Sequence, residues 1–136
     1  MSKTVVISGS GSMREKLLFW TQHFESLGYE IIAAPKPWNN SKDHDNQLKE
    51  LYVDFYDAID SCDIFFLMNE EKNGVAGYIG VNGMSELIYA TVQYLRGRKD
   101  LKVYLANTPS QQTAAYDEVN SFLRLGWAEV YTPVLI

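Results

Sequence analysis

Short apolar runs alternate with stretches of helical spacing along the chain. The apolar runs cover residues 5–7, 29–34, 63–68, 101–106 and 128–131. Between them, apolar side chains recur three and four positions apart, as they do on one face of a helix. These helical sets are Leu17, Trp20, Thr21, Phe24 and Leu27; Leu48, Leu51, Tyr52, Phe55, Tyr56 and Ile59; Met84, Leu87, Ile88, Val92 and Leu95; and Ala115, Val119 and Phe122. The pattern predicts five strands and four helices in strict alternation.

The most apolar run, residues 63–68, has no polar alternation, which is typical of a strand covered on both faces in the centre of a parallel sheet. Strands that alternate with helices favour such a sheet, and right-handed crossovers leave few topologies. We therefore expect an α/β fold with a doubly wound, five-stranded parallel sheet of the flavodoxin-like or Rossmann-like kind. Its expected strand order is 2-1-3-4-5, with helices on both faces, in one domain over residues 1–136.

Capping residues predict where three of the helices begin. The first helix is expected to start at Ser12. Asn82 is a good N-cap residue and would place Glu86 in the first turn of the third helix or just after it. Thr108, followed by Pro109, is expected to open the fourth helix.

Charge and cysteine content narrow the class of protein. The 136 residues include 12 Lys and Arg, 17 Asp and Glu and one Cys, with a net charge of −5. An acidic chain without a basic cluster is a poor binder of DNA or RNA. One Cys cannot form an internal disulfide or a Cys-rich zinc site, and the start of the chain lacks the apolar region of a signal peptide. We expect a cytoplasmic protein that spans no membrane and binds no metal and no polymeric nucleic acid.

The predicted topology also predicts where a ligand binds. In an open α/β sheet, ligands bind beyond the carboxyl ends of the strands, where the winding direction reverses. For order 2-1-3-4-5, this point lies between the first and third strands. The loops that follow those strands, residues 8–12 and 69–83, are also unusual in composition, since both are rich in glycine or small polar residues.

The first loop has the composition of an anion or sugar site. Its glycines let the backbone approach a ligand, and its hydroxyls and the following helix start supply donors. Arg14 in the first helical turn could pair with a phosphate. The same composition also makes an ordinary tight strand-to-helix turn. The candidate ligand-binding residues of this segment are Ser8, Gly9, Ser10, Gly11, Ser12 and Arg14.

The second loop leads to Glu86 at the expected start of a helix. A carboxylate there either complements the helix dipole, a common structural role, or stands ionised at the mouth of the crevice. In the second case it could serve as a nucleophile or stabilise a developing cation.

Several segments resemble the nucleoside 2-deoxyribosyltransferase superfamily, which includes deoxynucleoside 5′-monophosphate N-glycosidases. The similar segments are residues 78–90, 59–69, 7–10 and 102–105, in the order in which that superfamily has them. The resemblance implies the fold expected above and an activity that cleaves or transfers the N-glycosidic bond of a nucleoside or nucleoside 5′-monophosphate. It assigns Glu86 as the nucleophile and the first loop as a phosphate site. It also implies a homodimer or larger homo-oligomer and no cofactor.

Two positions depart from the pattern of the transferases. Gly80 stands where they carry an Asp that holds the nucleobase, and Phe55 stands where they carry a polar residue. Asp54 lies next to Phe55 and is a candidate catalytic residue, although one residue turns a helix by about 100°. These departures favour hydrolysis, or binding without turnover, over exchange of bases.

The remaining candidates lie in the second loop. Tyr78 could stack on a base, Asn69 could bind a ligand through its amide, and Gly80 and Asn82 border the expected crevice. Two other functions stay open. One is a nucleotide-binding or sensing module without turnover, and the other is an FMN-binding, flavodoxin-like protein that holds the flavin phosphate in its first loop.

Overall fold

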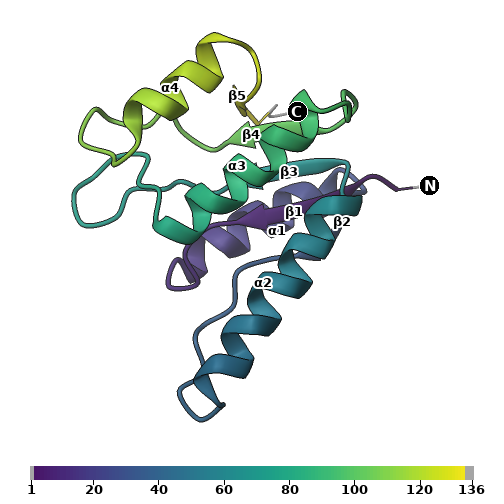
Figure 1. Ribbon diagram of the computed structural model, residues 1–136, viewed down its shortest axis with the longest axis vertical. Helices are drawn as coiled ribbons and strands as arrows, with labels where there is room; N and C mark the ends of the chain where they lie inside the picture. Colours follow the sequence, from purple (N-terminus) through teal and green to yellow (C-terminus); the bar gives the residue numbers. More distant parts are fainter. Residues whose placement is uncertain (1, 134–136) are drawn as a thin grey trace.

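A computed structural model describes residues 2–133 and contains one five-stranded sheet with four helices (Figure 1). The elements follow the chain as β1 Thr4–Ser8, α1 Arg14–Ser26, β2 Glu30–Ala33, α2 His44–Ser61, β3 Ile64–Leu67, α3 Val81–Leu95, β4 Lys102–Leu105, α4 Tyr116–Arg124 and β5 Glu129–Val130. All four strand pairings are parallel, and the strand order is β2-β1-β3-β4-β5. The expected doubly wound α/β fold, with its strand order, is confirmed.

The central strands have the double-sided burial that their composition predicted. All four residues of β3 are buried. Phe65 and Leu67 pack under α2, α3 and α4, whereas Ile64 and Phe66 pack under α1. Helices therefore cover both faces, three on one and one on the other. Among residues 2–133, no helix has both the length and the apolar character that a membrane crossing needs.

The start of α3 differs from the expectation. Gly80, in extended conformation, is the N-cap, and Val81 is the first helical residue. Asn82 is therefore the second residue of α3, and its side chain accepts a hydrogen bond from the Tyr52 hydroxyl at 3.2 Å instead of capping the helix. As a result Glu86 lies in the second helical turn, on the face of α3 that packs on the sheet.

The other two predicted starts were also wrong. α1 begins at Arg14, after Met13, and has no side-chain cap. α4 begins at Tyr116, eight residues after Thr108, because the intervening segment is tied to the loop after β3. The Ser110 amide donates to the carbonyl of Ala76 at 3.0 Å. These tertiary contacts override the local capping signal.

Candidate functional site

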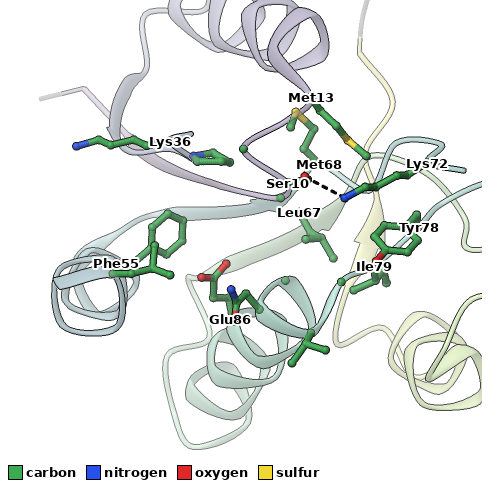
Figure 2. Close-up of a pocket in the computed structure, with 18 of the residues that line it drawn as sticks. Ser10, Met13, Lys36, Phe55, Leu67, Met68, Lys72, Tyr78, Ile79 and Glu86 are labelled. Atoms are coloured by element: carbon green, nitrogen blue, oxygen red, sulfur yellow. Dashed lines mark hydrogen bonds between the residues drawn. The ribbon is translucent and has the colours of Figure 1, made fainter. Parts of the chain in front are cut away.

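A pocket of about 330 Å³ lies at the carboxyl ends of β1 and β3 (Figure 2). The loops after β1, β2 and β3 form its walls, together with α2 and the first turns of α3. The pocket therefore occupies the position that the strand order predicts for a ligand site. Its lining residues are Gly9, Ser10, Gly11, Met13, Pro35, Lys36, Trp38, Leu51, Phe55, Leu67, Met68, Lys72, Tyr78, Ile79, Gly80, Val81, Asn82, Gly83 and Glu86.

Glu86 is the single acidic side chain among the described residues that line this pocket. It is 6% exposed, and its Oε1 accepts a hydrogen bond of 2.5 Å from the hydroxyl of Ser8, the last residue of β1. Within residues 2–133, no hydrogen bond reaches its other oxygen, Oε2. One carboxylate oxygen is thus positioned by the sheet, and the other is free to meet a ligand.

Burial changes the acidity of this group. Loss of solvent raises the pKa of Glu86 from 4.5 to about 7, although the hydrogen bond from Ser8 acts in the opposite direction. Near neutral pH, both the protonated and the ionised forms are therefore populated. A carboxyl group in this state can exchange a proton with a ligand or, when ionised, attack an electrophilic carbon.

The loop after β1 needs its glycines to form the pocket wall. Gly9 has φ +153°, and a Cβ at Gly11 would lie only 2.4 Å from the carbonyl oxygen of Lys36. Gly9, Ser10 and Gly11 line the pocket, while Ser12 is exposed. The Ser10 and Ser12 hydroxyls lie 2.8 Å apart and hydrogen-bond to each other.

Lys72 is a pocket residue that sequence reasoning missed. It lies in a short turn after β3, and its Nζ is 3.4 Å from the Ser10 hydroxyl and 5.3 Å from the ring centroid of Tyr78 (Figure 2). The pocket thus has a cation beside the glycine-serine loop. One signal in the sequence could have identified it. Lys72 lies within the second loop, residues 69–83, which the predicted strand order places at the site.

Arg14, which the sequence suggested as the phosphate partner, has a different contact. Its guanidinium donates a hydrogen bond of 3.2 Å to the carbonyl of Pro35, and its side chain lies outside the pocket lining. The lysines at positions 36 and 72 are the basic residues of the described lining.

Asp54 also lies outside the lining. It is exposed on α2, whereas its neighbour Phe55 is 8% exposed and faces the pocket. The helical turn of about 100° per residue separates their directions. The structure therefore brings Glu86 to the pocket without a second carboxylate from α2.

Asn69 is buried, lies two residues after the end of β3 and hydrogen-bonds to the loop after β4. Its amide group donates to the carbonyl of Asn107 at 2.7 Å, and its carbonyl oxygen accepts from the Asn107 backbone amide at 2.9 Å. This clamp fixes the loop after β3 to the loop after β4. Asn69 faces that contact, whereas Tyr78, Gly80 and Asn82 do line the pocket, as proposed from the sequence.

Three aromatic rings line the pocket, from three different segments. Phe55 comes from α2, Trp38 from the loop after β2, and Tyr78 from the loop before α3. Trp38 is 44% exposed and contacts the His44 ring at 5.2 Å between centroids. Such rings offer flat apolar surfaces on which a heterocyclic base can stack.

Among the described residues, no group of three or more His, Cys, Asp or Glu side chains could hold a metal ion. Comparisons of the chain with models of protein families, with curated proteins and with solved structures found no match.

Proposed function

We propose that the protein binds a nucleoside or nucleoside 5′-monophosphate and hydrolyses its N-glycosidic bond, with Glu86 as the nucleophile. The observation that carries the proposal is the Glu86 carboxyl group, buried beside a pocket and hydrogen-bonded by Ser8 through one oxygen only. A pocket of about 330 Å³ is within the size range of small-molecule sites.

The polar and apolar groups of the pocket suggest how such a substrate lies. Ser10, Lys72 and the glycine backbone suit the phosphate or the sugar hydroxyls, since they combine a cation with hydrogen-bond donors. Phe55 and Trp38 suit the base. In Figure 2, Phe55 and the Lys72–Tyr78 pair lie on either side of Glu86, an arrangement that supports a substrate whose base and phosphate lie on opposite sides of the carboxylate.

The reaction would proceed in two steps. Oε2 of ionised Glu86 attacks the anomeric carbon, the bond from that carbon to the base nitrogen breaks, and the base leaves with the electron pair and takes a proton from water. Water then cleaves the glycosyl ester, which releases the free sugar and a proton and restores the carboxylate. Because the transition state resembles an oxocarbenium ion, the negative charge of Glu86 stabilises it.

Release of free base from a panel of nucleosides and 5′-monophosphates tests this activity. A 2′-fluorinated nucleoside tests the nucleophile, since fluorine slows hydrolysis of the ester and allows it to accumulate. We expect the intact mass of the protein to increase by one fluorosugar, and Glu86→Gln to abolish the increase. No base release from any member of the panel, or full activity in Glu86→Gln, would refute the proposal.

A nucleotide-binding module without turnover is the second candidate. It is favoured by the lack of a second carboxylate among the described residues of the lining, since glycoside cleavage commonly uses two. Calorimetric titration with 5′-monophosphates distinguishes the two functions. Saturable binding with no release of base over a long incubation would select the binding module.

A further inference from the structure

Among the described residues, one wall of the pocket offers hydrogen-bond donors and no acceptor side chain. It is built from α2 and the loop after β2, and we call it the base wall. Its residues are Pro35, Lys36, Trp38, Leu51 and Phe55. Two of these side chains are polar, the Lys36 ammonium and the Trp38 indole, and both donate hydrogen bonds but accept none. The side chains of this wall therefore favour a ligand edge made of acceptors.

Two backbone acceptors of the base wall are engaged within the protein. The carbonyl of Pro35 accepts a hydrogen bond of 3.2 Å from the Arg14 guanidinium. The carbonyl oxygen of Lys36 packs closely on Gly11, since a Cβ on Gly11 would lie only 2.4 Å from it. An amino group on a ligand therefore meets fewer free acceptors at this wall than a carbonyl group meets donors.

The donors of the base wall remain open to a ligand. Lys36 is exposed, and within residues 2–133 its ammonium forms no ion pair. In Figure 2, Lys36 and Phe55 lie on the same side of Glu86, and the Lys72–Tyr78 pair lies on the other. A base stacked on Phe55 would therefore lie on the side of the pocket that holds Lys36.

The charges of the pocket also bear on how a base would leave. Glu86 is the only carboxyl group of the described lining, and in the proposed reaction it is ionised and attacks the sugar. The other ionisable groups of that lining are ammonium and phenol groups, which are much weaker acids than a carboxylic acid. The base would therefore depart as an anion, and a nearby ammonium stabilises such a charge.

A carbonyl group on the base suits both features of the pocket. Its oxygen accepts hydrogen bonds from the base wall, and it draws negative charge away from the ring nitrogen of the departing base. An amino group at the same position donates hydrogen bonds and withdraws less charge. Uracil has a carbonyl group where cytosine has an amino group, and hypoxanthine differs from adenine in the same way.

We propose that the substrate of this pocket carries an oxo base, of the uracil or hypoxanthine kind, and that the Lys36 ammonium stabilises the departing base. The second part rests on the proposed function, since only turnover produces a leaving group. As Oε2 of Glu86 forms the ester bond, the bond from the anomeric carbon to the ring nitrogen breaks. Its electron pair spreads over that nitrogen and the carbonyl oxygen, and the base then takes a proton from water.

Two matched pairs of nucleotides test the choice of base. Uracil and cytosine nucleotides with the same sugar and phosphate form one pair, and hypoxanthine and adenine nucleotides form the other. We expect kcat/KM to be at least about tenfold higher for the oxo member of each pair. An amino base that reacts as fast as its oxo partner would overturn the inference and leave the proposed function standing.

Binding measured without turnover separates the two proposals. Calorimetric titration of Glu86→Gln, which lacks the nucleophile, should show the same preference for the oxo member in each pair. Tighter binding of the oxo nucleotides with no base release by the wild-type protein would support the choice of base and refute the proposed function. Equal affinities, or tighter binding of the amino nucleotides, would overturn the choice of base whatever the activity.

Lys36→Met tests the charge that stabilises the departing base. We expect kcat/KM to fall about fivefold to tenfold for a uracil nucleotide, and by less for the 5-fluorouracil nucleotide, whose fluorine already stabilises the anion. The matched control is Lys49→Met, which removes an exposed lysine of α2 outside the described lining and should leave both rates within about twofold. Equal losses for the two bases in Lys36→Met, or the same pattern in Lys49→Met, would refute this role of Lys36.

Discussion

Two glutamates at the same end of the sheet have opposite surroundings. Glu70 borders a second hollow, of about 520 Å³, on the α1 face, and Glu86 borders the pocket on the α3 face. Both oxygens of Glu70 are occupied, one by the indole of Trp20 at 2.7 Å and one by the amide of Asn107 at 3.1 Å. Glu86 has one hydrogen bond, from Ser8.

Glu70 has the contacts of a structural carboxylate, whereas Glu86 has those of a reactive one. Glu70 uses both of its oxygens to join α1 to the loops after β3 and β4, which gives it a structural role. Glu86 is more deeply buried and less fully satisfied, a state that costs free energy of folding. A buried carboxyl group whose pKa is raised by desolvation is typical of functional sites.

Replacement of each carboxylate in turn should give the largest difference between the two glutamates, in the rate of base release. We expect Glu86→Gln to lower the rate of base release at least about a thousandfold, because the amide is no nucleophile. Glu70→Gln should leave that rate within about threefold, since Glu70 is not among the lining residues of the Glu86 pocket. Initial rates with the best substrate of the panel check both. Equal losses in the two variants would contradict the division of roles.

The pH dependence of the activity should follow the acidity of Glu86. Since burial raises the pKa of Glu86 to about 7, the ionised fraction rises by about 100-fold between pH 5 and pH 8. We expect kcat/KM to increase by about that factor and to level off above pH 8. A flat profile over this range would show that ionised Glu86 is not the reactive form.

The stability of the fold should have the opposite dependence on pH. The folded-state pKa of Glu86 lies above its unfolded value, at about 7 against 4.5, so the folded protein binds more protons between these values. The free energy of unfolding should fall as the pH rises through this window, by on the order of 3 kcal/mol in total. Urea denaturation at pH 5 and pH 8 measures the change. Glu86→Gln should reduce it strongly, and a difference of the same size in that variant would exclude Glu86 as its source.

Much of the framework behind these glutamates could be predicted from the sequence. The apolar run over residues 63–68 contains β3, and the run over 29–34 contains β2. Hydrophobic period and composition are enough to locate these strands, because a strand in a parallel sheet covered on both faces consists mostly of apolar residues. The place of the pocket followed from the strand order alone.

Contacts between distant segments could not be predicted in this way. Ser8 and Glu86 are 78 residues apart, and nothing in either segment specifies that the two side chains meet. The predicted start of α4 was wrong because Gly77 packs closely on Pro109. A Cβ on Gly77 would lie only 2.5 Å from the Cα of Pro109. Lys72 was missed because it belongs to no local sequence motif and meets Ser10 only in the folded chain.

Loss of the Glu70 contacts should affect stability and spare the chemistry. Glu70→Ala leaves the indole NH of Trp20, a residue that is 5% exposed, without its acceptor. We expect a loss of about 1–3 kcal/mol in the free energy of unfolding, as for other buried donors without a partner. Thermal and urea denaturation measure it, with Glu25→Ala, at an exposed glutamate of α1, as the control. An unchanged stability would mean that water replaces the carboxylate at no cost.

The smallest expected effect concerns Lys72, whose role should differ between substrates with and without a phosphate. Lys72→Met keeps most of the length of the side chain and removes the charge that lies 3.4 Å from the Ser10 hydroxyl. If this end of the pocket holds the phosphate, KM for a nucleoside 5′-monophosphate should rise about fivefold to tenfold, which corresponds to about 1 kcal/mol, with kcat little changed. KM for the matching nucleoside should stay within about twofold. Arg14→Met is the control, since the Arg14 guanidinium contacts the carbonyl of Pro35 outside the lining. A larger effect of Arg14→Met, or equal effects of Lys72→Met on nucleoside and nucleotide, would show that Lys72 does not bind the phosphate.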